Sequence, residues 1–246
     1  MNLAIRGISY DLGKQGLGES SSFTDDQHKD MKVDYIMANT PFNLKDWRGE
    51  NELLDDPRWQ GYAVPPKSNA NYAWILHILS KLDVTNGVAG FLLANGALNA
   101  DGIEREIRQK LIENDKVEAI IVLPRNMFYT TDISVTLWIL NNNKSDHELH
   151  GYLIRNHQNE VLFMDLRQWN DHVQQYKVEK GTNKKKTILT DEQIAKVKLI
   201  YQSWQKGSDY EDIPELCKSV TIDKIKEANY SLAPSKYMGV SRSLCK

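Results

Sequence analysis

The sequence has few cysteines and no long apolar run. Its 246 residues include two cysteines, Cys217 and Cys245, which lie apart in the chain. A secreted scaffold held by disulfides is therefore not expected, and a reducing cytoplasm is the expected location. The most apolar run, residues 87–98, is far shorter than the roughly 20 residues that span a bilayer. No membrane role is expected.

The sequence also lacks an excess of positive charge. Its formal net charge is −2, and 41% of its residues are hydrophobic. That apolar content is enough to bury the core of one large domain or two small ones. A protein that holds DNA by itself usually carries a basic excess, which displaces counterions from the phosphates. If this chain contacts DNA, we expect another component to assist it.

Apolar patterns in residues 33–140 predict half of a doubly wound α/β sheet. Runs without alternation predict strands covered on both faces, at 33–38, 88–94, 117–123 and 134–140. The last two of these are close enough in sequence to pair antiparallel. A mostly buried helix is predicted at 72–82. Asp101 and Glu104 resemble a capping box for the next helix, which places Ile103, Ile107 and Leu111 on the sheet.

The rest of the chain predicts smaller units. Residues 152–154 and 161–164 are expected to form an appended hairpin. Residues 177–187 are lysine-rich and polar, which is typical of a linker. Thr190 and Gln193 have the spacing of a capping box, and an amphipathic helix is expected to follow. Residues 220–239 predict a further short helix and a loop.

Four residues at the end of the first predicted strand carry the most specific chemistry, because open α/β sheets bind ligands beyond the carboxyl ends of their strands. The side chain of Asn39 offers an acceptor oxygen, and Pro41 forces Thr40 into an extended conformation that presents its carbonyl. Phe42 adds a flat apolar face. Two acceptors and a stacking ring suit the exocyclic amino group of a planar base.

A base reaches such a pocket only after leaving the duplex, and stacking with edge hydrogen bonds offsets that cost. Two acceptors would orient the amine for methylation and stabilise the charge that develops on nitrogen. On chemistry alone, however, an ordinary turn with a buried ring is the commoner explanation of an Asn-x-Pro-Phe segment. The surrounding sequence decides between them.

Residues 34–43, with Lys45, Asp46 and Trp47, closely resemble the Asn-Pro-Pro-Phe motif region of the modification subunit of type I restriction–modification systems, an N6-adenine DNA methyltransferase family. Further segments that resemble the family follow in the same order along nearly the whole chain. They are residues 1–7, 71–74, 90–96, 123–124 and 127–131.

The resemblance implies transfer of a methyl group from S-adenosylmethionine to adenine N6 in DNA. It also implies a complex with a specificity subunit, which reads the DNA sequence, and with a restriction subunit. Asn39, Thr40, Pro41 and Phe42 would be the catalytic residues. Phe128, Tyr129 and Thr130 resemble the family loop that lines the base pocket, although an ordinary connecting turn explains them equally well.

Two departures from the family pattern matter. Thr40 stands where the family has the first of two prolines, so the carbonyl is kept but the stiffening ring is lost. The family's glycine-rich cofactor loop is expected upstream of Met1, so the isolated chain is expected to lack a cofactor site and activity. Gly13, Gly16 and Gly18 follow no clear strand and are a weak substitute.

The resemblance implies a division into three parts. Residues 1–145 would be the carboxy-terminal half of the catalytic domain, 146–187 a hairpin and lysine-rich linker, and 188–246 a helical tail for subunit contacts. The fold expected is a partial Rossmann-like S-adenosylmethionine-dependent methyltransferase fold. The alternative function is a non-catalytic remnant that binds specificity or restriction subunits or DNA.

Two other features have simpler explanations. His77 lies in an apolar helix without a partner at metal spacing, so a core histidine is expected and no metal site. The run Lys184, Lys185 and Lys186 could contact phosphate, but a solvated linker is at least as good an explanation.

Overall fold

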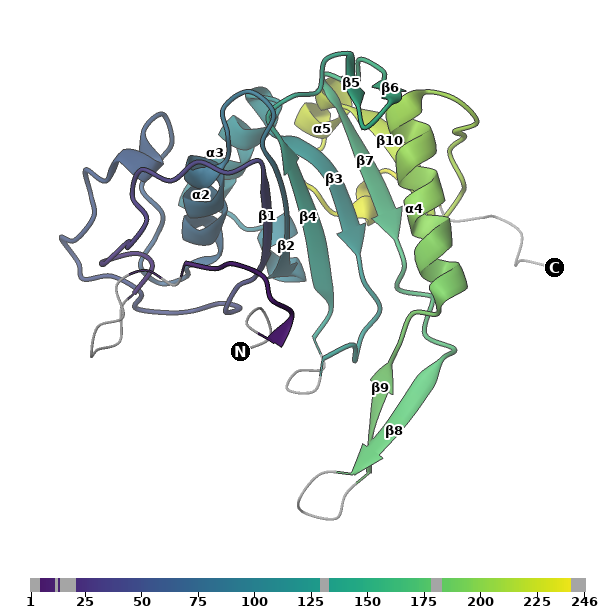
Figure 1. Cartoon of the computed structure of the whole chain (residues 1–246), viewed down its shortest axis with the longest axis horizontal. Helices are drawn as coiled ribbons and strands as arrows, with labels where there is room; N and C mark the ends of the chain where they lie inside the picture. The colour runs from purple at the N-terminus through teal and green to yellow at the C-terminus, as the bar shows by residue number, and fades with distance from the viewer. Residues whose placement is uncertain (1–4, 12, 14–20, 129–132, 178–182, 240–246) are drawn as a thin grey trace.

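A mixed six-stranded sheet forms the centre of the computed structural model, which describes residues 5–11, 13, 21–128, 133–177 and 183–239. The strand order is β1-β2-β4-β3-β7-β10 (Figure 1). The strands are β1 (Tyr35–Asn39), β2 (Val88–Ala94), β3 (Val117–Val122), β4 (Val135–Asn141), β7 (Glu160–Asp165) and β10 (Cys217–Thr221).

Strand directions bring four strand ends to one edge of the sheet. β1 runs parallel to β2, and β3 runs parallel to β7. β4 lies between β2 and β3 and is antiparallel to both, which confirms the antiparallel pairing predicted for the last two strands. β1, β2, β3 and β7 therefore all end at the same edge, which we call the carboxyl edge.

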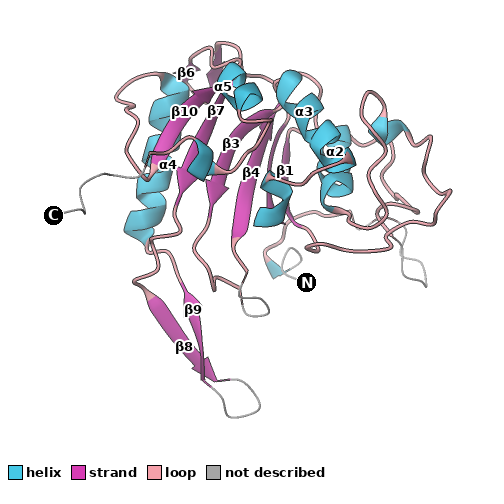
Figure 2. Ribbon diagram, turned by 180° about the vertical axis from the view of Figure 1, so that it is seen from behind, coloured by secondary structure: helices cyan, strands magenta, loops and turns pink. Residues whose placement is uncertain are grey.

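Helices cover both faces of the middle of this sheet. The prediction that the strand at 33–38 is covered on both faces is wrong, because β1 is an edge strand and its Tyr35 and Met37 are 61% and 93% exposed. Ile120 and Val122 of β3 share a core with α2 (Asn71–Lys81), α3 (Ile103–Glu113) and α5 (Ile222–Glu227), whereas Ala119 and Ile121 share a core with α4 (Asp191–Lys206). This alternation is the period of two of a β-strand, and Figure 2 shows the first layer from its own side. Short 3-10 helices are η1 (Pro57–Trp59), η2 (Asn95–Leu98) and η3 (Pro234–Lys236). No helix in the described ranges is long and apolar enough to cross a bilayer.

Helix caps follow the sequence in one case and depart from it in the other. In α4 the Thr190 hydroxyl accepts from the Gln193 N–H (3.2 Å) and the Gln193 side chain accepts from the Thr190 N–H (2.9 Å), so the predicted capping box is confirmed. The box predicted at Asp101 is wrong. The N-cap of α3 is Gly102, at φ 63°, and it has no side-chain cap, because the helix begins one residue later than Asp101 requires.

The hairpin predicted between residues 152–154 and 161–164 is also wrong. β6 (Tyr152–Ile154) pairs with β5 (His147–Leu149) in a small separate sheet. β7 instead enters the central sheet, between β3 and β10. Its residues Val161, Leu162, Phe163 and Met164 are all buried. A strand with apolar side chains on both faces buries far more surface in a central sheet than in an exposed hairpin.

The segment predicted as a lysine-rich linker, residues 177–187, includes the second strand of a further hairpin. β8 (Val173–Lys177) and β9 (Asn183–Thr187) form a two-stranded antiparallel sheet, with Tyr176 opposite Lys184. It projects beyond the carboxyl edge of the central sheet (Figures 1 and 2). These strands were not predicted because they show no apolar pattern. A two-stranded ribbon pairs its backbone N–H and C=O groups across the two strands and needs no apolar face.

Candidate functional site

The segment Asn39 to Phe42 begins at the last residue of β1 and therefore lies at the carboxyl edge. A cavity of about 500 Å³ opens beside it, which we call the edge cavity. The size is within the range of small-molecule sites. It is lined by Asn39, Thr40, Pro41, Phe42, Asn43, Phe128 and Ile133.

The side chains of Asn39 and Thr40 have different environments. Asn39 is exposed and lines the edge cavity, so its amide is available to a ligand. Thr40 is 7% exposed, and its hydroxyl donates to the Leu92 carbonyl at 3.1 Å. Leu92 is the β2 partner of Asn39. The hydroxyl therefore ties the turn to the neighbouring strand, at the position where the resemblance implies a proline.

The rings of Phe42 and Phe128, which both line the edge cavity, form a pair. Their centroids are 6.2 Å apart and their planes meet at 80°, an edge-to-face pair. Phe128 lies in the connection after β3, so the topology brings together two residues that the sequence predicted as one pocket.

Several positions used in the sequence predictions lie outside the described residues. Tyr129 and Thr130, predicted with Phe128 to line the base pocket, are two of them. Met1, Gly16 and Gly18, used in the cofactor prediction, are others. These parts of the predicted site stay predictions.

A pair of asparagines, which the sequence did not single out as functional, holds the turn after Phe42. The Asn43 N–H donates to the Asn71 side-chain oxygen (3.1 Å), and the Asn71 amide donates back to the Asn43 side chain (2.9 Å). Asn43 has φ 53°, a left-handed conformation that asparagine tolerates better than most residues. Asn71 is 2% exposed and begins α2. The core thus fixes the segment that carries Phe42.

A second cavity, also of about 500 Å³, adjoins the other side of the segment and shares Asn39, Thr40 and Pro41 with the first. His77 lines it and lies 3.1 Å from the Arg58 guanidinium through Nδ1. Arg58 can only donate, so His77 accepts and is neutral. Burial, with help from the Arg58 charge, lowers the pKa of His77 to about 4. The part of the chain that the structure describes has no cluster of metal-ligating side chains.

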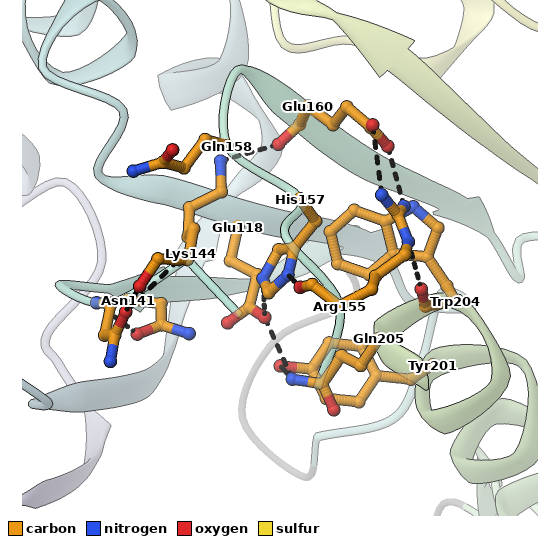
Figure 3. A network of polar contacts seen from close by, with 12 residues as sticks. Glu118, Asn141, Lys144, Arg155, His157, Gln158, Glu160, Tyr201, Trp204 and Gln205 are labelled. Atoms are coloured by element: carbon orange, nitrogen blue, oxygen red, sulfur yellow. Dashed lines mark hydrogen bonds and ion pairs between the residues drawn. The ribbon is translucent and has the colours of Figure 1, made fainter. Parts of the chain in front are cut away.

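A polar network at the opposite edge of the sheet has a structural role. Glu118 and His157 are both fully buried and 3.0 Å apart, and Gln205 of α4 donates to the same carboxylate oxygen (2.9 Å) (Figure 3). Burial raises the pKa of Glu118, but the bonds from His157 and Gln205 outweigh it and the pKa is lowered. Lys144, 3% exposed, pairs with Asp115. These groups face each other at the amino end of β3, away from the edge cavity.

Comparison with known proteins shows the family to which the chain belongs. A family model described as N-6 DNA Methylase matches residues 1–244. The chain belongs to this family. It is 40% identical over 98% of its length to the type I restriction enzyme HindI methylase subunit of Haemophilus influenzae. It is 37% identical, again over 98% of its length, to the MjaIX methylase subunit of Methanocaldococcus jannaschii.

Solved structures of such subunits share the fold of this N-6 DNA methylase family chain. The type I methyltransferase subunit from Streptococcus thermophilus matches 97% of the chain with a TM-score of 0.75 and 26% identity. The EcoKI M protein matches 94% of the chain with a TM-score of 0.64 and 16% identity, which shows the fold alone. The predicted methyltransferase fold class is thereby confirmed. The chain spans 49% of the length of the HindI subunit and 45% of the S. thermophilus chain.

Proposed function

We propose that this chain supplies the target-base half of a type I DNA methyltransferase subunit, which transfers a methyl group from S-adenosylmethionine to adenine N6. One observation carries the proposal. The exposed amide of Asn39 and the rings of Phe42 and Phe128 all line one cavity at the carboxyl edge of the sheet. An acceptor beside two apolar rings is what a flipped base with an exocyclic amine requires.

Each residue of the segment has a role in this proposal. The side-chain oxygen of Asn39 and the backbone carbonyl of Thr40 accept the two N6 hydrogens, and they direct the nitrogen lone pair away from the ring plane. Phe42 stacks on the base, while Phe128 borders it. Pro41 keeps the Thr40 backbone extended. Stacking of this kind is worth about 1–3 kcal/mol per base, which offsets part of the cost of extruding it.

We infer that the described residues supply only part of an S-adenosylmethionine site. Such a site in this fold needs a free carboxylate for the ribose and open N–H groups at a helix start. Beside the second cavity, the Asp26 carboxylate is paired with Lys81 at 2.6 Å, whereas Asp25 lines the cavity and is exposed. The Asn71 N–H at the start of α2 donates to Asn69 (2.9 Å). We therefore derive no step through the cofactor, and we assign its binding to the part of the relatives' length that this chain does not match.

The proposed partners follow from the family and from charge. With a net charge of −2, the chain has little general attraction for DNA, so a specificity subunit would read the sequence and supply further phosphate contacts. A restriction subunit is the second partner that the resemblance to the type I family implies. The alternative, a non-catalytic remnant, was suggested by Thr40. The hydrogen bond from its hydroxyl to Leu92 supports a turn that is still held for catalysis.

The test is methyl transfer by the full subunit assembled with its specificity subunit. Asn39→Ala removes one acceptor, so we expect the turnover number on a DNA duplex to fall by about 100-fold or more. Asn51→Ala is the matched control, because Asn51 is an exposed asparagine outside both cavities. The measurement is incorporation of labelled methyl at adenine, with complex formation checked by gel filtration.

Two results would count against the proposal. Equal turnover in the Asn39→Ala and Asn51→Ala complexes would remove Asn39 from the site. Failure of the unmodified, correctly assembled complex to methylate DNA would favour the binding-only remnant.

A further inference from the structure

The β8–β9 hairpin stands apart from the central sheet. It forms a sheet of its own, and both views show it extending past the edge at which β3 and β7 end (Figures 1 and 2). Two-stranded hairpins are marginally stable by themselves in water. A protruding ribbon of this kind therefore points to a contact with something outside the described chain.

The charge of the hairpin strands differs from that of the rest of the chain. Val173–Lys177 and Asn183–Thr187 contain four lysines, Lys177 and Lys184 to Lys186, and no acidic residue. The whole chain has a net charge of −2. Positive charge is thus concentrated on the projecting element of a chain that is otherwise acidic.

The base of the hairpin is fixed to the connection that carries Phe128. The Thr187 N–H donates to the Asn126 carbonyl at 2.8 Å, and Asn126 lies two residues before Phe128. Thr187 is 4% exposed. The Ile188 N–H closes the base by donating to the His172 carbonyl (3.1 Å). The hairpin and one wall of the edge cavity are therefore held by the same short segment.

We propose that β8–β9 is an arm that contacts the phosphate backbone of duplex DNA next to the target base. The proposal rests on the function proposed above for the edge cavity. Lysine side chains bind phosphates as point charges and displace condensed counterions. Five residues of strand span roughly 17 Å, which is about half a turn of the double helix at ~34 Å per turn. The arm is long enough to follow the backbone on one side of an extruded base.

The experiment measures binding of the full subunit, assembled with its specificity subunit, to a mixed-sequence DNA duplex by fluorescence anisotropy at several salt concentrations. In the arm variant, Lys184, Lys185 and Lys186 are all changed to Gln. The matched control changes Lys110, Lys198 and Lys224 to Gln, which removes the same charge from exposed positions on α3, α4 and α5. Circular dichroism checks that each variant keeps its secondary structure.

We expect the arm variant to bind at least about tenfold more weakly than the control, with a log–log salt dependence that is less steep by roughly two to three phosphate contacts. Equal affinity and equal salt slope in the two variants would overturn the proposal. Absence of duplex binding by the unmodified complex, even at low salt, would overturn it as well. Equally tight binding of polyglutamate, lost in the arm variant, would assign the arm to an acidic protein instead.

This outcome is separable from that of the proposed function, which is read by methyl transfer in the Asn39→Ala complex. Loss of duplex binding in the arm variant together with unchanged methylation in Asn39→Ala would retain the arm and reject the base site. Unchanged duplex binding in the arm variant together with lost methylation in Asn39→Ala would reject the arm and retain the base site.

Discussion

At position 40, a hydroxyl holds a turn for which the family resemblance implies a proline ring. The ring acts by restricting φ, whereas the Thr40 hydroxyl acts by bonding to the Leu92 carbonyl on the next strand. A net contribution of about 1 kcal/mol is typical of such a bond. The carbonyl of residue 40 keeps its place by a different interaction, so the loss of one proline does not by itself indicate a decayed site.

His77 gives a residue-scale prediction about pH. Burial and the Arg58 charge, with a further contribution from Lys81, lower its pKa from 6.5 to about 4, and Asp26 and Asp56 oppose the shift. Between these pH values the unfolded chain binds more protons, so stability is complete above pH 6.5 and is lost as pH falls toward 4. We expect the free energy of unfolding to fall by about 2 kcal/mol between pH 7 and 5 because of this group.

The measurement is urea unfolding at pH 7 and pH 5, where most carboxylates stay ionised. His77→Gln should reduce the difference between the two pH values by most of that amount. His150→Gln, at an exposed position, should leave the difference unchanged. A pH dependence that is the same in all three proteins would show that His77 is not the group responsible.

Among the elements, those determined by local pattern were predictable from the sequence. The strand predicted at 88–94 is β2 (Val88–Ala94), because a short run of seven residues without charge, next to an Asn-Gly turn, is typical of a strand covered on both faces. β7 was misassigned because its partner, β3, lies about 40 residues earlier in the chain and no local pattern records that pairing. β9 was missed because lysine is common in linkers and its strand has no apolar face.

The same distinction applies to the candidate site. Asn39 and Phe42 could be selected because they stand at the end of an apolar strand, and Phe128 because it follows another. The exposure of Tyr35 and Met37 in that strand could not be predicted, because it depends on the place of β1 at the edge of the sheet. That the two rings lie 6.2 Å apart depends on the strand order. Asn71 carries no signal of its role beyond its place at a helix start, since its bonds to Asn43 cross 28 residues.

The capping box of α4 leads to a prediction at the scale of one element. Thr190→Ala removes the acceptor for the Gln193 N–H, and we expect a loss of about 1 kcal/mol in the free energy of unfolding. Thr221 is the matched control, because it is the N-cap of α5 but makes no side-chain cap bond. Thr221→Ala should therefore cost clearly less in urea unfolding. A reversed order would contradict the assignment of the cap.

At the scale of the whole molecule, one buried guanidinium connects distant parts of the chain. Arg108 of α3 is 2% exposed. It donates to the Tyr230 carbonyl (2.7 Å), to the Ala100 carbonyl (2.7 Å) and to the Tyr72 hydroxyl (3.3 Å). α2, α3 and the segment after α5 therefore meet at a single side chain, which fixes the helical layer on one face of the sheet.

This junction predicts a large effect of one substitution. Arg108→Met keeps the bulk of the side chain but leaves buried acceptors without donors, so we expect the free energy of unfolding to fall by about 3 kcal/mol. Lys110→Met, at an exposed position of the same helix, should change it by less than about 0.5 kcal/mol. Chemical denaturation of both variants measures the difference, and similar midpoints would show that the junction contributes little.

The Arg108 junction also bears on the order in which the chain is made. Residue 108 leaves the ribosome 122 residues before Tyr230, an interval of roughly 6–24 s at synthesis rates of about 5–20 residues per second. Until then, burial would deprive the guanidinium of water without supplying the Tyr230 carbonyl, so α3 gains little by docking early. We therefore expect the helical face of the sheet to close late in synthesis, so that a chaperone that binds exposed apolar surface has its longest opportunity there.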